Sequence, residues 1–429
     1  MRFRTDRPPT WQACAGCGNE LAVNDARARC PVCGGLLELH HRPPELTRDE
    51  LIERFTTRRG LARDVPASGV WRFRDVVLPG VERVVSHPEG NTPLLHREAL
   101  DRYTGLRRLL LKHEGHNPTG SFKDRGMTVG VTQAVRLGAA AVACASTGNT
   151  SASLASYAAH AGIPALVLVP AGNVAMGKLA QSLAYGARTL LVRGDFDDCL
   201  RLAEEASTTL GVYLLNSINP FRLEGQKTIV LELLQQLGWE PPDWIVLPAG
   251  NLGNTAAFGK ALREAREWGL IPRLPRLAAI QASGAAPFAR SFAEGFSRRY
   301  TVRAETVATA IRIGDPASYD RAVRAIRETD GVVLAVDDEA ILAAKAAVDA
   351  CGVGCEPASA ASVAGVRALV AQGAIRPEQH VVAVLTGHVL KDPGMLLQYH
   401  RDTEPPPAGA NRPVEIEPDL REVERQLRR

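Results

Sequence analysis

Short apolar runs alternate with longer helical segments between about residues 85 and 400. Seven runs have the length and composition of strands, and they cover residues 107–112, 141–146, 165–170, 188–193, 243–249, 276–282 and 380–386. Alanine-rich segments with helical periodicity lie between them. Because each continuous apolar strand is followed by a helix, the pattern predicts parallel sheets that are covered on both faces. We expect an α/β fold with two open, mainly parallel, doubly wound sheet domains and a cleft between them.

The segments on either side of this region follow other patterns. Residues 1–45 contain four closely spaced cysteines, and residues 46–95 combine a linker with one amphipathic helix. The core is expected to cover residues 96–402, with a smaller subdomain at about 120–220 inserted in the larger one. The last segment, 403–429, is rich in proline and then in charge, which is typical of a linker followed by a short exposed helix.

Composition limits the classes of function. A hydrophobic fraction of 45% and a charged fraction of 23% are ordinary for a globular protein, and a net charge of +4 over 429 residues gives no indication of nucleic-acid binding. The sequence contains no run of about 18 apolar residues, so it predicts no membrane span. The N-terminus also lacks the apolar region of a secretory signal. We therefore expect a cytoplasmic protein with reduced cysteines.

Four of the eight cysteines form two Cys-x2-Cys pairs. Each pair lies in a glycine-containing turn, and the four cysteines are Cys14, Cys17, Cys30 and Cys33. Four thiolates at this spacing predict a zinc ribbon, whose role would be structural because no coordination position stays open. Disulfides or a metal-free knuckle are the alternatives, and a reducing compartment disfavours the first. The other four cysteines lie in apolar stretches and are expected to be buried.

Two strand-to-helix turns suit anionic groups. Residues 250–254 form a loop rich in glycine and asparagine after a strand that ends at Pro248. Its backbone N–H groups can converge beside a helix N-terminus, which suits a phosphate, although a plain turn has the same composition. Residues 146–150 are rich in hydroxyl and amide groups, which suit a carboxylate or, alternatively, cap the following helix.

A lysine lies at a third turn. In the segment NPTGSFKDRG, residues 117–126, Lys123 begins a helix after a tight turn. An ammonium near a helix N-terminus is disfavoured and burial lowers its pKa further, so this amine suits Schiff-base chemistry. A solvated surface lysine is the simpler alternative. We expect Asp124 and Arg125 to support the turn.

These three features point to one cofactor. Pyridoxal phosphate needs a Schiff-base lysine, a clamp for its phosphate and a site for the substrate carboxylate. The sequence offers all three without a metal, and it therefore predicts an enzyme that uses pyridoxal phosphate on a small-molecule substrate.

Eight segments between residues 89 and 393 resemble threonine synthase, one of the fold-type II pyridoxal-phosphate enzymes. In chain order they read EGNTPL, HNPTGSFKDRGM, STGNTSAS, PAGNVAMGKLAQSLAYGA, NSINPFRLEGQKT, PAGNLGNTAAFGKA, TAIRIGDPAS and LTGHVLKDP. The resemblance covers roughly residues 70–395. It implies two α/β domains that enclose the cofactor and a homodimer, and some members of the family carry an N-terminal cysteine knuckle.

The resemblance also implies a role for each matching residue. Lys123 would be the Schiff-base lysine, Phe122 would lie beside the ring, and Asn149 would bind the 3-oxygen of the cofactor. Thr386 would face the ring nitrogen, where a hydroxyl leaves that nitrogen largely unprotonated. The cofactor phosphate would bind to Gly250, Asn251, Leu252, Gly253 and Asn254. The substrate carboxylate would bind to Ser146, Thr147 and Thr150, and the substrate phosphate to Asn216, Ser217 and Arg222.

The implied reaction converts O-phospho-L-homoserine and water to L-threonine and phosphate by γ-elimination and β-addition. Two positions depart from the common pattern of the family: Asn173 replaces a lysine and Val389 replaces a glycine. Both flank the cofactor contacts and bear on substrate detail. The alternatives are a β-replacement enzyme such as cysteate synthase, a threonine or serine dehydratase, and a zinc-ribbon binding protein without activity.

Overall fold

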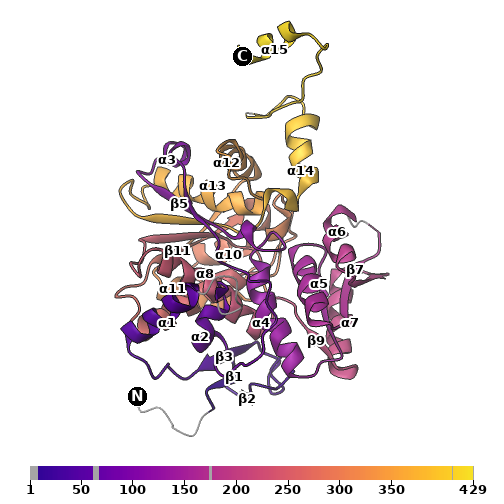
Figure 1. Cartoon of the computed structure of the whole chain (residues 1–429), viewed down its shortest axis with the longest axis vertical. Helices are drawn as coiled ribbons and strands as arrows, with labels where there is room; N and C mark the ends of the chain where they lie inside the picture. Colours follow the sequence, from indigo (N-terminus) through magenta and orange to yellow (C-terminus); the bar gives the residue numbers. More distant parts are fainter. Residues whose placement is uncertain (1–7, 61–66, 173–175, 408, 429) are drawn as a thin grey trace.

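Two sheets form the centre of the computed structural model, which describes residues 8–60, 67–172, 176–407 and 409–428 (Figure 1). The larger sheet has six strands in the order β12-β11-β10-β13-β5-β4, and the smaller has four in the order β8-β7-β6-β9. All neighbouring strands are parallel except β4 and β5, which confirms the predicted α/β class with mainly parallel sheets. The strands are β4 (Leu94–His96), β5 (Leu109–His113), β6 (Ala141–Ala145), β7 (Ala165–Pro170), β8 (Arg188–Val192), β9 (Val212–Leu214), β10 (Trp244–Pro248), β11 (Arg276–Ala282), β12 (Val332–Val336) and β13 (Val381–Leu385).

The seven predicted strands are all present, and three further strands were missed. Two of these, β4 and β9, have only three residues each, which is too short for a pattern. The third, β12, has the sequence VVLAV, which is as continuously apolar as that of β13, so its signal was present in the sequence and was overlooked.

Helices cover both faces of the larger sheet. Trp244 and Val246 of β10 pack into one apolar cluster with α3, α12 and α13, whereas Ile245 and Leu247 pack into another with α8 and α9. Successive side chains of β10 point to opposite faces, and both faces are buried. This explains why the sequence of the strand is continuously apolar. The helices of the core are α3 (Glu98–Thr104), α4 (Lys123–Arg136), α5 (Asn149–Ala161), α6 (Met176–Ala184), α7 (Phe196–Thr209), α8 (Pro220–Gln236), α9 (Gly253–Glu267), α10 (Pro287–Ala293), α11 (Tyr319–Glu328), α12 (Asp338–Ala350) and α13 (Pro357–Ala371).

The cysteine-containing segment folds as a three-stranded antiparallel sheet in the order β2-β1-β3, at the end of the molecule opposite the C-terminal tail (Figure 1). Its strands are β1 (Thr10–Cys14), β2 (Glu20–Ala22) and β3 (Leu37–His41). Side chains of the core hold the backbone of β3: Lys260 Nζ on α9 donates to Leu39 O at 2.6 Å, and Arg321 Nη2 on α11 donates to Leu37 O at 2.6 Å. The sheet is therefore docked on the helices of the core.

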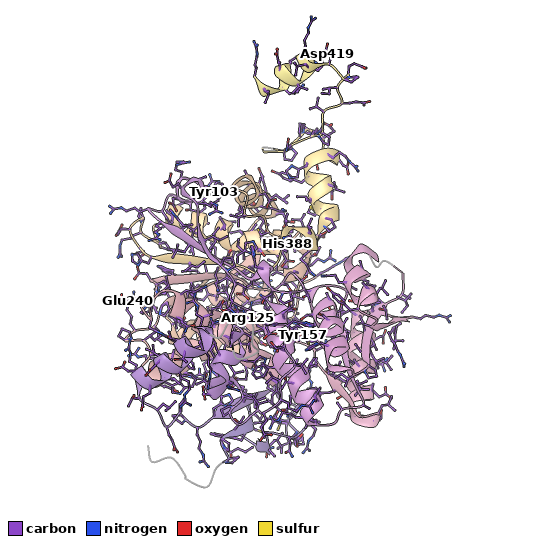
Figure 2. The ribbon with its side chains drawn as sticks, viewed as in Figure 1. Tyr103, Arg125, Tyr157, Glu240, His388 and Asp419 are labelled. Carbon is purple, nitrogen blue, oxygen red and sulfur yellow. The ribbon has the colours of Figure 1, made fainter. Side chains whose placement is uncertain are left out.

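The remaining helices are peripheral. They are α1 (Arg48–Gly60), α2 (Arg74–Val77), α14 (Pro393–Leu397) and α15 (Leu420–Leu427). The last of these lies away from the body of the molecule, with Asp419 at its start (Figure 2). Among the described residues, we find no helix with the length and apolar character needed to cross a membrane.

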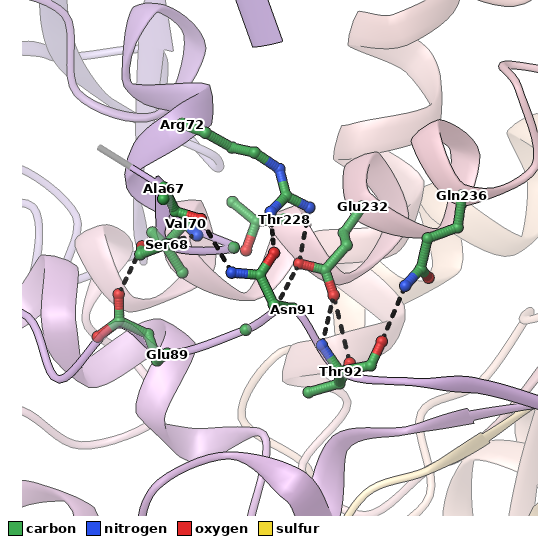
Figure 3. Close-up of polar contacts among 12 residues, drawn as sticks. Ala67, Ser68, Val70, Arg72, Glu89, Asn91, Thr92, Thr228, Glu232 and Gln236 are labelled. Carbon is green, nitrogen blue, oxygen red and sulfur yellow. Dashed lines mark hydrogen bonds and ion pairs between the residues drawn. The ribbon is translucent and has the colours of Figure 1, made fainter. Parts of the chain in front are cut away.

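A buried network of charges joins the loop at residues 89–93 to α4, α8 and β5. Figure 3 shows the part of it around Arg72, Asn91, Thr92 and Glu232. The Glu232 carboxylate on α8 accepts from Arg125 Nη2 at 2.8 Å, Lys112 Nζ at 2.6 Å and Arg72 Nη2 at 2.9 Å. Arg125 also pairs with Glu114, at 2.6 Å. Burial opposes the ionisation of Glu232, but the three cations outweigh it and hold the pKa of this carboxyl well below its usual range.

The network predicts a large loss of stability for Glu232→Ala. The substitution leaves three buried cations without their shared carboxylate, and breaking a buried ion pair costs about 3–5 kcal/mol. Chemical denaturation of the cofactor-free protein measures this loss. Glu98→Ala removes an exposed carboxylate that lies 3.9 Å from Arg102 on α3 and should leave the midpoint unchanged. Equal effects of the two substitutions would contradict the interpretation.

Candidate active site

Lys123 lies where the turn at residues 117–122 meets the segment that follows β13. Phe122 N donates to Thr386 O at 3.0 Å, and His388 N donates to Gly120 O at 2.9 Å. A short antiparallel pairing thus aligns residues far apart in the sequence, and it brings the backbone of the turn beside Thr386. Lys123 is the first residue of α4, directly after this pairing.

The two charges that follow Lys123 hold the turn, as the sequence suggests. Asp124 accepts from Thr119 N at 2.7 Å, from the Thr119 hydroxyl at 2.6 Å and from Ser153 Oγ at 2.6 Å. Burial raises its pKa to about 6. Since Ser153 lies on α5, this carboxyl joins the turn to the smaller sheet domain. Arg125 belongs to the network around Glu232 and is at the centre of the molecule (Figure 2).

The Lys123 amine is electrostatically unusual. Its Nζ lies 4.5 Å from the centroid of the Phe122 ring, and we find no hydrogen-bond partner for it among the described residues. Burial, together with the positive charge of Arg222, lowers its pKa to about 7, against a weaker opposing effect of Glu356. A sizeable fraction of the amine is therefore unprotonated and nucleophilic near neutral pH.

Close packing of α4 and α8 fixes Lys123 relative to Arg222. A Cβ atom on Gly225 would lie 1.7 Å from Arg125 O, and one on Gly126 would lie 2.9 Å from Arg222 O. Both positions are limited to glycine because backbone meets backbone there. The two helix starts therefore form one rigid unit.

Arg222 is a buried cation that pairs with no carboxylate in the described part of the chain. Its side chain is 1% exposed, and its Nη1 donates to Leu215 O at 3.0 Å. Its Nε and Nη2 have no hydrogen-bond partner among the residues that the structure describes, and burial lowers its pKa to about 10. A buried guanidinium with two free donors is costly unless an anion binds to it. Such an anion would lie close to Lys123, whose pKa Arg222 perturbs.

The predicted phosphate loop follows β10 and leads into α9. Leu252 has a positive φ of 62° just before the helix, a strained conformation for a side chain of this kind. Asn251 holds the loop in place, since its Nδ2 donates to Ser217 Oγ at 2.7 Å and its Oδ1 accepts from Ala317 N at 2.7 Å. At the start of α9, Asn254 Oδ1 and Thr255 Oγ1 are buried, and no described residue forms a hydrogen bond with either atom. These two atoms are available to a group that binds at the loop.

The second turn predicted to bind an anion, residues 146–150, follows β6. Gly148 N donates to Ser146 Oγ at 3.2 Å, and Asn149 begins α5 with its Nδ2 donating to Glu356 Oε2 at 3.0 Å. Thr147 and Thr150 are half-buried in the same turn. The Asn216 amide bonds to both backbone polar atoms of Ala145, with Ala145 N donating at 3.0 Å. Asn216 thus supports the strand from which this cradle begins.

Glu356 is the residue of this site that sequence reasoning missed. It precedes α13, is buried, and contacts Asn149 as well as Thr386, whose Oγ1 lies 3.3 Å from Glu356 Oε1. It stands directly before Pro357, the first residue of the helix, so the local sequence does not distinguish it from any other residue before a helix. Its partners lie 207 and 30 residues away in the sequence, which no local pattern reveals.

The two departures from the family pattern are placed differently. Val389 begins a short 3-10 helix, η6 (Val389–Lys391), and lies close to Gly354, where a Cβ atom would be 3.2 Å from Val389 Cβ. Asn173 lies outside the described residues.

The four predicted zinc ligands converge. Their sulfur atoms all lie within 4.8 Å of one another, with 3.4 Å between Cys14 and Cys33 and 3.6 Å between Cys17 and Cys30. Three of the other cysteines, Cys144, Cys199 and Cys355, are buried as expected, and Cys351 is partly exposed.

Comparisons with known proteins agree with this arrangement. The family model described as pyridoxal-phosphate dependent enzyme matches residues 85–387. A threonine synthase of Methanosarcina acetivorans is 48% identical over 89% of this chain and 92% of its own length, and one of Methanocaldococcus jannaschii is 42% identical over 97% and 99%. The chain belongs to the threonine synthase family. It is a pyridoxal-phosphate-dependent enzyme of the α/β type that the sequence predicts.

A solved structure extends the likeness of the fold beyond the core. The threonine synthase of Escherichia coli is 19% identical, with a TM-score of 0.70 over 96% of this chain and 94% of that one. Within the threonine synthase family, the polar atoms left free at Arg222, Asn254 and Thr255 fit a phosphorylated cofactor and substrate.

The low pKa of Lys123 predicts that this lysine costs stability in the cofactor-free protein. Below pH 7 the folded protein must carry a poorly solvated ammonium, so Lys123→Met should raise the free energy of unfolding there. The advantage should shrink as the pH rises from about 7 toward 10.5, because only the unfolded chain then binds the proton.

Denaturation midpoints of the two proteins across this pH range test the prediction. Arg102→Met, at a 74% exposed side chain, is the control and should show no such pH dependence. A wild-type protein that is more stable than Lys123→Met at every pH would contradict the prediction.

Proposed function

We propose that this chain converts O-phospho-L-homoserine and water to L-threonine and phosphate, as a threonine synthase. Its similarity to threonine synthases over most of both chains supports the reaction. The single observation that carries the substrate class is the buried, unpaired Arg222 near the Lys123 amine. It suits a substrate that brings its own phosphate, unlike serine or threonine in a dehydratase.

The cofactor would be held by residues from four segments. Lys123 would bind it covalently, Phe122 would lie beside the ring, Asn149 would bind the 3-oxygen, and Thr386 would face the ring nitrogen. Its phosphate would bind to the loop formed by Gly250, Asn251, Leu252, Gly253 and Asn254. Convergent N–H groups at the start of α9 suit a phosphate dianion without a metal.

The bound cofactor supplies an electron sink for the bonds to the substrate α-carbon. The chain supplies the rest. When it is not bound to the cofactor, the Lys123 amine could accept and return protons near neutral pH, because its pKa in the cofactor-free protein is about 7. Its position at the rigid α4–α8 contact keeps this base in one place.

Substrate recognition would be shared between the turn at residues 146–150 and Arg222. Ser146, Thr147 and Thr150 would bind the carboxylate through hydroxyl and backbone groups. Arg222 would bind the phosphate through Nε and Nη2. Ser217 would contribute its hydroxyl, which accepts a hydrogen bond from Asn251. Asn216 would act mainly by holding Ala145, because its amide is already engaged with that backbone.

Product analysis tests the proposal. The cofactor-loaded protein should form threonine and phosphate in equal amounts from O-phosphohomoserine, and it should form no comparable product from phosphoserine with sulfite, from serine or from threonine. Borohydride reduction should fix the cofactor on Lys123, and Lys123→Ala should lose both turnover and the visible absorbance. Phosphate release without threonine would overturn the assignment.

We also propose that Cys14, Cys17, Cys30 and Cys33 bind one structural zinc ion. Zn–S bonds of about 2.3 Å in a tetrahedron place sulfur atoms about 3.8 Å apart, close to the separations of 3.4 and 3.6 Å observed here. The ion would stabilise the small sheet, which has few apolar side chains of its own.

Metal analysis of the purified chain should find about one zinc per chain. Cys30→Ser should lose the metal and lower the thermal midpoint, whereas the control Cys351→Ser should keep both. Zinc retained in Cys30→Ser, or a wild-type protein that is equally stable without metal, would contradict the zinc proposal.

The predicted domain boundaries, 1–45, 46–95, 96–402 and 403–429, with a subdomain at about 120–220, are retained as a proposal. The separate three-stranded sheet and the four-stranded sheet between Ala141 and Leu214 support them. The homodimer and the cytoplasmic location stay predictions.

A further inference from the structure

One carboxyl group bridges two residues that would lie at different edges of the cofactor ring. Glu356 Oε2 accepts from Asn149 Nδ2 at 3.0 Å, and Glu356 Oε1 lies 3.3 Å from Thr386 Oγ1. We propose that Glu356, in its neutral form, positions both residues and leaves the hydroxyl proton of Thr386 free for the ring nitrogen. This inference rests on the cofactor contacts given under the proposed function.

The backbone fixes the carboxyl in this place. Glu356 N donates to Gly387 O at 3.1 Å, and Gly387 N donates to Ser359 Oγ at 2.9 Å, so the start of α13 is joined to the end of β13. A Cβ atom on Gly387 would lie 2.5 Å from the Glu356 carboxyl, which shows how closely that group packs on the backbone. Glu356 therefore has little freedom to move away from Asn149 and Thr386.

The hydrogen-bond directions around Thr386 follow from this geometry. Ser359 Oγ already accepts from Gly387 N, and the distance to Gly387 O is 3.5 Å, so its proton is best placed for Thr386 Oγ1 at 3.0 Å. The Thr386 hydroxyl then has one acceptor position and its own proton left. Whether Glu356 donates or accepts a hydrogen bond decides how this acceptor position and this proton are used.

The two protonation states of Glu356 have opposite effects. A neutral carboxyl accepts from Asn149 through its carbonyl oxygen and donates through its O–H to Thr386, whose own proton can then point at the ring nitrogen. An ionised carboxylate can only accept, so it takes the Thr386 proton for itself. The ring nitrogen is expected to be unprotonated opposite a hydroxyl. It can then accept a hydrogen bond, which the Thr386 hydroxyl would donate.

Burial shifts Glu356 toward its neutral form. Burial raises the pKa of this carboxyl, while hydrogen bonds from Asn149 and Thr386 and the positive charges of Lys391 and Lys123 act in the opposite direction. The neighbouring Cys355 thiol stays protonated, since burial raises its pKa as well. When bound, the cofactor would further shield Glu356 from water.

The bridge also orients Asn149. Because Glu356 Oε2 accepts in either protonation state, it holds the Nδ2 group of Asn149 rather than its oxygen. The second N–H of that amide is then available for the 3-oxygen of the cofactor. Glu356 acts through other residues, and it is a positioning residue rather than a catalytic one.

Glu356→Gln is the informative variant, because the amide copies the neutral acid: its oxygen can accept from Asn149 and its NH2 can donate to Thr386. In the cofactor-free protein, infrared difference spectra between wild type and Glu356→Gln should show a protonated carboxyl band at neutral pH. In the loaded wild-type protein, raising the pH should alter the visible absorbance and lower kcat together. Glu356→Gln should keep most of the neutral-pH activity and lose that pH dependence.

Two controls separate positioning from general structural effects. Glu356→Leu can neither accept nor donate, and it should weaken cofactor binding by about tenfold or more, since Asn149 and Thr386 both lose a partner. Glu339→Gln, at an exposed residue of α12, should leave every readout unchanged. If Glu356 is ionised at neutral pH, or if Glu356→Gln is as impaired as Glu356→Leu, the inference is wrong.

The infrared readout is independent of the substrate. If the protein turned over another amino acid, the proposed function would fail while the carboxyl band and the absorbance changes would still stand. If threonine formation were confirmed but Glu356→Gln kept the pH dependence of wild type, only the role of Glu356 would fail.

Discussion

The Glu232 carboxylate is the constraint on which the geometry of the site depends. It is shared by Arg72, Lys112 and Arg125, which come from separate parts of the chain, and none of these charges can reach water. Because an unpaired buried charge is so costly, the four groups tolerate little displacement. Arg125 is two residues after Lys123, so the network fixes the start of α4, and with it the reactive amine, relative to α8 and β5.

The contrast between paired and unpaired charges distinguishes the scaffold from the site. The charges around Glu232 are paired with one another. In the described structure, by contrast, Arg222 Nε and Nη2 have no hydrogen-bond partner, and we find none for the Lys123 amine. The scaffold thus supports a guanidinium and an amine for which we find no ion-pair partner among the described residues. Anionic groups of the cofactor and the substrate can supply what is missing, which makes binding energy available where the reaction takes place.

Local features of this chain were predictable, and long-range ones were not. The strands, the turn before Lys123 and the Cys-x2-Cys pairs carry their signals within about twenty residues, and the structure contains them. Glu356 and the Glu232 network were missed because each depends on partners that the fold alone brings together, such as Arg125, which is 107 residues from Glu232. The role of Asn216 at the substrate phosphate stays a prediction, and its hydrogen bonds to Ala145 are a further contact that side-chain chemistry alone does not reveal.

A second buried cluster shows why the small cysteine-containing sheet bears on the site at all. Glu224 on α8 pairs with Lys227 at 2.5 Å, with Lys260 on α9, and with His41 of β3 at 2.9 Å. Burial lowers the pKa of His41, so a neutral ring donates from Nε2 to Glu224 while Nδ1 accepts from Thr10 at 3.0 Å. The helix α8 is therefore held at Glu224 by the small sheet and α9, and at Glu232 by α4 and β5. Arg222 lies at the beginning of this doubly fixed helix, and a guanidinium held so rigidly loses little entropy when it binds an anion.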